Sequence, residues 1–309
     1  MLVSIIVCTY SLNNFQNFVE AVDSLLNQTY ENIEVVIVVD GNEELFNKIQ
    51  EYYGARESVK AVSLKENMGV SIARNIGTKA ARGDVIAYFD DDAVAEKMWI
   101  QNLVDIYQKL DAISVGGKIL PLWIPRKPDF FPEELGWLVG MTGEGFAEDK
   151  VVELRNTWES NISFKREVFD EVGFFNENFG FAKGGTSYRQ GPAAEFALRM
   201  RHKLGKGVIY NPEAVIYHKI PASKTRVKLL LKRSLYQGYS KIMLKRSSPA
   251  SKTLNTEKSY LKDLLIKYIP RRIKGIFSLN FIKEIKQLSF LVAVIICVGL
   301  GFAYGYVKR

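Results

Sequence analysis

The first 120 residues alternate between short runs rich in β-branched residues and longer stretches in which apolar residues recur at helical spacing. The short runs predict strands at 2–8, 33–39, 59–64, 84–89 and 112–117. The stretches between them predict helices over 15–27, 43–53, 68–81 and 95–110. This order predicts an α/β fold, Rossmann-like, whose mostly parallel sheet is doubly wound with right-handed crossovers.

Polar side chains follow three of the predicted strands at the point where each strand ends. Thr9 and Tyr10 come after the first strand, Asp40 comes after the second, and a run of aspartates at 90–92 comes after the fourth. The carboxyl ends of parallel strands meet at one edge of a sheet, and ligands of such sheets bind beyond that edge. We therefore expect these groups to converge on one site.

The aspartates at 90–92 are difficult to place together without a counter-charge, because like charges a few ångströms apart repel strongly beside a buried strand. Mg²⁺ or Mn²⁺ removes this repulsion, since either cation prefers carboxylate oxygens and shares its remaining positions with substrate phosphates. An acidic turn that caps the following helix is the alternative. The strand in front of the run, with Thr9 and Asp40 nearby, favours a metal site that serves a nucleotide diphosphate.

Residues 288–307 form a stretch of twenty residues without a charge, which is long enough to cross one bilayer as a helix. Basic residues lie on both sides of it, and Tyr304 and Tyr306 stand where interfacial aromatic side chains are common. A buried core helix is the alternative, but core helices of this length usually carry a polar face. The segment predicts a single transmembrane helix.

The charge of the chain changes sign at residue 218. Residues 1–218 hold 22 Lys and Arg against 31 Asp and Glu, whereas 219–309 hold 20 against 3. Between 219 and 287, apolar residues recur at helical spacing among the basic ones, which predicts helices on an anionic membrane face; a solvated basic linker is the alternative. An excess this local argues against a uniformly basic nucleic-acid binder, so no nucleic acid partner is expected.

The beginning of the chain is apolar but has neither a basic region nor a cleavage site ahead of its first strand, so no signal peptide is expected. With many basic residues before a single late span, the positive-inside rule predicts a single-pass protein of the cell membrane with its main domain in the cytoplasm. The two cysteines, Cys8 and Cys297, lie in separate apolar runs and predict no disulfide.

Six segments together resemble a known family. Runs 3–10, 40–41, 67–77 and 87–93 resemble the nucleotide-sugar half of the family 2, GT-A type glycosyltransferases, and runs 159–166 and 173–177 resemble the acceptor half, which ends with the strand and histidine at 212–218. Runs 137–146, 152–169, 210–219 and 237–241, with the final span, resemble more closely the archaeal glucosyl-dolichyl-phosphate glucuronosyltransferases of the N-glycosylation pathway. The resemblance implies a glycosyltransferase with a UDP-sugar donor and a dolichyl or polyprenyl phosphate-linked sugar acceptor.

The resemblance also assigns site residues. It implies that Thr9 and Asp40 contact the base and ribose, that Arg74 lies near the nucleotide or its phosphates, and that a DxD pair binds Mn²⁺ or Mg²⁺. The implied donor-binding set comprises Thr9, Tyr10, Asp40, Arg74, Asn75, Asp90 and Asp91, and the implied metal ligands are Asp90, Asp92 and His218. Asp92 is the expected direct ligand of the pair. A structural role is the alternative for His218, as it is for Thr9, Asp40 and Arg74.

The acidic pair that supplies the catalytic base in this family is missing. Pro192 and Ala193 stand where the pair is expected, and Glu195 is the carboxylate left in that stretch. Either Glu195 takes the proton of the acceptor, or the chain is a non-catalytic scaffold that binds nucleotide-sugars. A nucleotidyltransferase is a third interpretation, which the absence of glycine from residues 9–14 disfavours.

We therefore expect an inverting transferase with a GT-A domain at 1–218, a basic juxtamembrane region at 219–287 and a transmembrane helix at 288–307. If the donor is a uronic acid, a fixed cation should meet its carboxylate, and Arg155, Lys183 and Arg189 are the candidates. The last two belong to a glycine-rich segment, 183–189, that is suited to closing over a donor; a plain loop is the alternative.

Overall fold

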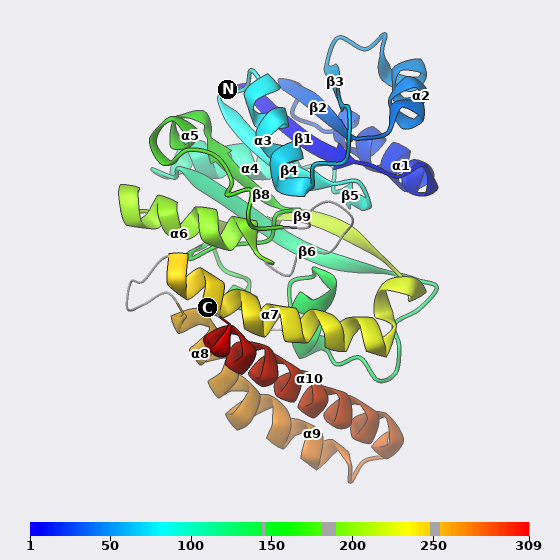
Figure 1. Ribbon diagram of the computed structural model, residues 1–309, viewed down its shortest axis with the longest axis vertical. Helices are drawn as coiled ribbons and strands as arrows, with labels where there is room; N and C mark the ends of the chain where they lie inside the picture. The colour runs from blue at the N-terminus through cyan, green and yellow to red at the C-terminus, as the bar shows by residue number, and fades with distance from the viewer. Residues whose placement is uncertain (144–145, 181–189, 248–253, 309) are drawn as a thin grey trace. The chain divides into compact units, whose positions relative to one another are not determined.

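The computed structural model describes residues 1–143, 146–180, 190–247 and 254–308 (Figure 1). The chain divides into two compact units. The first contains Met1–Leu120, Ala147–Ser187 and Gly191–His218, and the second contains Pro121–Phe146, Tyr188–Gln190 and Lys219–Arg309. The sequence assigned all of 1–218 to one domain, whereas Pro121–Phe146 groups with the C-terminal part of the chain.

A nine-stranded mixed sheet forms the first unit, and it extends beyond that unit only at the ends of two strands. Its strands are β1 (Val3–Thr9), β2 (Ile33–Asp40), β3 (Val59–Leu64), β4 (Val85–Asp90), β5 (Ala93–Ala95), β6 (Ser114–Ile124), β7 (Val152–Leu154), β8 (Ile162–Lys165) and β9 (Val208–Pro221). They lie in the order β3-β2-β1-β4-β8-β6-β9-β5, with β7 paired to β9. The first four predicted strands are present and parallel, which confirms the Rossmann-like part of the prediction.

The fifth predicted strand is present as β6, but it does not lie beside β4. The short strand β8 is inserted between them and runs antiparallel to both. Antiparallel pairing also joins β9 to β5 and to β7. The sheet is therefore parallel from β3 to β4, whereas the pairings of β8 with β4 and β6, and of β9 with β5 and β7, are antiparallel.

Among the described residues, six helices of at least seven residues cover the two faces of the sheet. They are α1 (Phe15–Leu26), α2 (Glu43–Tyr53), α3 (Val70–Ala80), α4 (Trp99–Lys109), α5 (Arg166–Val172) and α6 (Pro192–Leu204). Short 3₁₀ turns lie at Leu12–Asn14 and Phe146–Asp149. Helix α4 begins four residues after the predicted start, because Ala93–Ala95 pairs with β9 as a strand instead.

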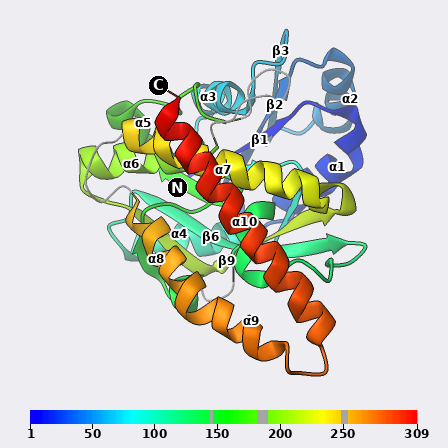
Figure 2. The ribbon, with the colours of Figure 1, turned by 60° about the horizontal axis from the view of Figure 1, so that its bottom comes forward.

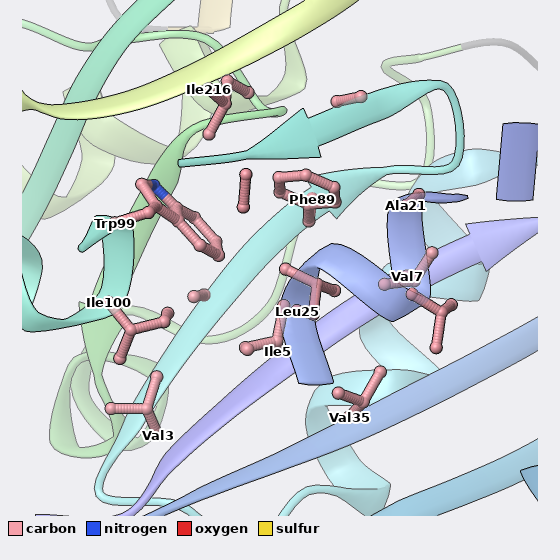
Figure 3. Close-up of a cluster of buried hydrophobic side chains, with 14 of the residues drawn as sticks. Val3, Ile5, Val7, Ala21, Leu25, Val35, Phe89, Trp99, Ile100 and Ile216 are labelled. Carbon is pink, nitrogen blue, oxygen red and sulfur yellow. The ribbon is translucent and has the colours of Figure 1, made fainter. Parts of the chain in front are cut away.

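The alternation of side chains along the strands separates the core into two layers. Val3, Ile5 and Val7 of β1 point to one face, where they pack with α1, α2 and α4; Figure 3 shows this cluster around Trp99 and Phe89. Ile6 points to the opposite face, where side chains of α3, α5 and α6 complete a second cluster. Both faces are buried, as in other open α/β sheets.

The second unit is mainly helical. It contains a 3₁₀ segment at Glu133–Val139, a 3₁₀ turn at Ala222–Thr225, α7 (Val227–Ser247), α8 (Asn255–Asp263), a π-helical turn at Leu264–Tyr268, α9 (Ile269–Gly275) and α10 (Phe281–Val307). Phe131 and Leu135 pack with Leu230, Leu264 and Phe290 in a separate hydrophobic core. This core explains why 121–146 belongs with the C-terminal helices.

A buried ion cluster lies within the second unit. The guanidinium of Arg272 donates two hydrogen bonds to the Glu134 carboxylate, of 3.0 and 2.8 Å, and one of 3.1 Å to Glu284 Oε2. It also donates to Gln287 Oε1. The Glu134 side chain is fully buried, so Arg272 supplies the counter-charge that its burial requires.

Helices α7 and α10 pack closely along their lengths, and Figure 2 shows α10 (red) lying across α7 (yellow). Glycines permit the approach: a Cβ atom on Gly301 would lie 1.8 Å from the carbonyl oxygen of Leu235. Near the end of α10, Arg246 of α7 donates to the carbonyls of Gly305 (2.8 Å) and Lys308 (3.0 Å). The sequence predicted that α7 lies on a membrane surface, but it did not predict this pairing.

Candidate nucleotide and metal site

The carboxyl ends of β1, β2 and β4 form the edge where the sequence placed the site. At the end of β2, Asp40 accepts hydrogen bonds from the backbone N–H groups of Met68 (2.7 Å) and Gly69 (2.9 Å). Gly41 has φ +74°, and a Cβ there would lie 2.1 Å from the Asn67 nitrogen, so only glycine fits this turn. Asp40 therefore holds the loop that leads into α3, and each carboxylate oxygen keeps a further lone pair for a ligand.

The ends of β1 and β4 are joined by a side-chain hydrogen bond. The Thr9 hydroxyl donates to Asp91 Oδ2 over 2.7 Å. Burial, followed by the charge of Asp92, raises the pKa of the Asp91 carboxyl to about 6. The hydrogen bond from Thr9 acts in the opposite direction and favours the ionised form.

Arg74 projects from α3 into the same edge. Its guanidinium lies 3.2 Å from Asp90 Oδ1, and its side chain is only 9% exposed. Burial alone would lower the pKa of this guanidinium, but the charges of Asp90 and then Glu159 raise it above its ordinary value. The site therefore contains a buried, permanently charged cation beside the aspartate run, at a position suited to an anionic phosphate.

Asp90, Asp92 and His218 form a cluster with metal-binding chemistry. One potential ligand atom from each lies within 4.8 Å of the others, and His218 Nε2 is 3.1 Å from Asp92 Oδ1. The pairing of β5 with β9 sets His218 beside Ala93 and so brings it to the aspartates. Two carboxylate oxygens and one imidazole nitrogen fit Mn²⁺, and the carboxylates also suit Mg²⁺.

Two other predicted donor contacts differ in their surroundings. Tyr10 is 64% exposed beyond the end of β1, and its backbone carbonyl accepts a hydrogen bond from Asn42 Nδ2. Asn75 is buried, and its amide makes two hydrogen bonds of 2.9 Å with the backbone of Phe175. Asn75 thus fixes the segment after α5 against α3, and its contact with a donor stays a prediction.

Glu195, the carboxylate that the sequence offered as base, is paired. Arg199 lies one turn later on α6 and binds it with two hydrogen bonds, from Nε to Oε1 (2.7 Å) and from Nη2 to Oε2 (3.0 Å). The Glu195 side chain is 5% exposed. Of the three candidate partners for a uronate, Arg155 is half-buried and donates to Asn156, while Lys183 and Arg189 lie outside the described residues.

Comparisons with known proteins decide the family. The sequence profile of glycosyl transferase family 2 matches residues 4–173. The chain is 42% identical over 306 residues to the glucosyl-dolichyl phosphate glucuronosyltransferase of Haloferax volcanii, covering 99% of this chain and 96% of that protein. The chain belongs to glycosyl transferase family 2.

Solved structures show the same fold at low sequence identity. The mannosyltransferase PcManGT from Pyrobaculum calidifontis, in complex with GDP-Man and Mn²⁺, has a TM-score of 0.61 at 16% identity and covers 95% of this chain and 86% of its own. Staphylococcus aureus TarS 1–349, in complex with UDP-GlcNAc, has a TM-score of 0.55 at 15% identity and covers 96% and 82%. These similarities confirm the GT-A fold predicted for this family 2 glycosyltransferase.

Proposed function

We propose that this family 2 glycosyltransferase transfers glucuronate from UDP-glucuronate to glucosyl-dolichyl phosphate or a related polyprenyl phosphate-linked sugar, with inversion at the anomeric carbon. The near full-length similarity to the Haloferax volcanii enzyme carries this proposal. The site supports it, because the buried guanidinium of Arg74 and a carboxylate cluster lie together at the edge of the sheet.

Different residues of the site bind the nucleotide, balance the charge of the diphosphate and bind the metal. Thr9, Tyr10 and Asp40 surround the place of the base and ribose, and Arg74 balances the charge of the diphosphate. Asp90, Asp92 and His218 would hold the divalent cation, which would supply positive charge to balance the negative charge of the departing diphosphate. The cluster itself fits either Mn²⁺ or Mg²⁺.

The direct test is an assay of UDP release by the detergent-solubilised protein with Mn²⁺, a panel of UDP-sugars, and dolichyl phosphate-linked glucose present or absent. We expect release from UDP-glucuronate that depends on the acceptor. Acceptor-dependent release from a different UDP-sugar would reject the donor, and a product with the anomeric configuration of the donor would reject inversion. UDP binding without turnover would indicate the non-catalytic scaffold instead.

We also propose that α10 attaches the enzyme to the cell membrane with the first unit in the cytoplasm. The helix spans 27 residues and is long and apolar enough to cross a membrane. Val292, Ile296 and Leu300 lie on one face and are 42 to 58% exposed. An apolar face of this length needs a lipid or protein environment.

The packing of α7 bears on whether α10 crosses the bilayer. Helix α7 carries six Lys and Arg residues beside α10, and charged side chains are costly at the membrane centre. A tag at the C-terminus, probed in intact cells and in inverted vesicles, tests the single-pass arrangement. We expect the tag outside and the first unit inside; tag and first unit on the same side would show that α10 lies along the membrane.

A further inference from the structure

The turn before β8 places one more carboxylate at the site. Strands β4 and β8 are antiparallel, with Tyr88 opposite Ile162. Glu159 belongs to the turn at 158–161 that leads directly into β8, next to the end of β4. Its charge acts on Arg74, whose guanidinium lies 3.2 Å from Asp90, so Glu159 lies near the aspartates. The carboxyl end of β4 and the amino end of β8 therefore contribute to the same site.

Three hydrogen bonds of the Asn161 side chain fix the backbone of the turn that carries Glu159. Asn161 is fully buried, and its Oδ1 accepts a hydrogen bond of 2.9 Å from the indole N–H of Trp99. Its Nδ2 donates to the carbonyls of Lys118 (3.0 Å) and Ala214 (2.9 Å). These bonds tie the turn to α4, β6 and β9. A side chain on such a turn is pre-positioned, which is what a catalytic group requires.

The Glu159 carboxylate lies where the family's acidic pair is absent. Its Oε1 accepts a hydrogen bond of 2.9 Å from the backbone N–H of Ala193, at the first turn of α6. Ala193 and Pro192 are the residues that replace the acidic pair. The charge of Glu159 also acts on Arg74, the partner of Asp90. A carboxylate from the turn before β8 thus lies next to the position where α6 would otherwise carry the acidic pair.

The two candidate carboxylates differ in their freedom to accept a proton. Both oxygens of Glu195 are bound by Arg199, whose guanidinium also donates to the carbonyls of Val172 and Phe174. Glu159 is half-buried, and among the described residues its Oε2 has no hydrogen-bond partner. Oε2 can therefore accept a hydrogen bond from an acceptor hydroxyl, which the geometry of Glu195 disfavours.

We propose that Glu159 is the catalytic base, an inference that rests on the proposed glycosyl transfer. Its Oε2 takes the proton of the acceptor hydroxyl as the hydroxyl oxygen forms a bond to the anomeric carbon. The bond between that carbon and the diphosphate oxygen breaks, and its electron pair leaves with UDP. The products are the glycoside, UDP and a protonated Glu159, which returns its proton to water.

Glu159→Gln separates proton transfer from helix capping. The Gln carbonyl still accepts from the Ala193 N–H, so the start of α6 keeps its hydrogen bond. We expect kcat to fall by about 10²–10⁴-fold, the usual contribution of a general base. UDP binding in the presence of Mn²⁺ should stay within about twofold of wild type, because Gln removes none of the nucleotide or metal contacts. Glu159→Asp should recover part of the lost rate.

The pH profile provides a readout that a structural role would not move. In wild type, kcat should rise with pH as the base ionises, and this limb should be absent in Glu159→Gln. Glu167→Gln, an exposed change on α5, is the matched control and should match wild type. Glu159→Gln with wild-type kcat and pH profile, or Glu195→Gln with the larger loss, would overturn the assignment. Wild-type protein inactive with every donor would overturn the proposed function and the base together.

Discussion

Asp92→Ala is expected to lower acceptor-dependent UDP release by roughly 10³-fold, the upper range for losing one charge-stabilising group. Asp92 provides one of the three ligand atoms of the cluster, and its Oδ1 lies beside His218. In the proposed site, Asp90 and His218 alone would hold the cation weakly, and the charge of the departing diphosphate would be poorly neutralised. Titrating Mn²⁺ against kcat should show a higher half-saturating concentration as well as a lower maximum.

Asp170→Ala is the matched control for this change. Asp170 is exposed on α5, so the same substitution should leave both the rate and the Mn²⁺ dependence unchanged. Wild-type metal dependence in Asp92→Ala would show that the cation binds elsewhere. Isothermal titration with UDP in the presence and absence of Mn²⁺ would locate the defect, because loss of the metal site should remove the part of the binding that depends on Mn²⁺.

Arg272→Met is expected to lower the free energy of unfolding by about 3–5 kcal/mol, the typical cost of removing one partner of a buried ion pair. The change leaves the fully buried Glu134 carboxylate without the guanidinium that donates two hydrogen bonds to it. Thermal unfolding of the detergent-solubilised protein, followed by circular dichroism, measures the effect.

Arg271→Met tests whether burial causes this loss. Arg271 makes a longer contact, 3.5 Å, with the same Glu134 oxygen, and its side chain is 41% exposed. Exposed pairs contribute at most about 1 kcal/mol, so the neighbouring substitution should lower stability far less. Equal losses at the two positions would show that net charge, and not burial, determines the effect.

The sequence predicted the parallel half of the sheet well, because each strand there carries its own signal. Largely apolar, β-branched runs such as Val3–Thr9 have only seven residues, which is too short for a typical helix and favours a strand, and polar residues at the ends of these runs mark the site edge. Strand β8 has only four residues and is followed at once by α5. Nothing local in so short a run indicates that it inserts between β4 and β6.

Dependence on pairing between distant segments also explains why the sequence did not single out Glu159. Its place at the site depends on the pairing of β4 with β8 and on a hydrogen bond to a residue 34 positions later. The available signal was indirect: a missing acidic pair implies that another carboxylate must serve. Glu195 was chosen because it is near in sequence, but its pairing with Arg199 becomes visible only when α6 is folded.

Contacts between residues that are far apart in the sequence were also hard to foresee. The donor contact expected of Asp40 stays a prediction, while the structure shows that Asp40 holds the backbone of Met68 and Gly69. The second unit presents the same difficulty, because its core joins Phe131 to Phe290, which are far apart in sequence. The apolar length of α10 was readily predicted, while its close packing with α7 depends on which faces carry glycine.

The pairing of β9 with β5 has a consequence for the order in which the protein becomes functional during synthesis. Chains generally fold domain by domain as they emerge, beginning at the N-terminus. His218 is at once the last residue of the first unit and a member of the candidate metal cluster. A nascent chain that ends before it has the aspartates of the cluster but not the histidine. All three residues of the proposed metal site are therefore synthesised while α10, Phe281–Val307, has still to be translated.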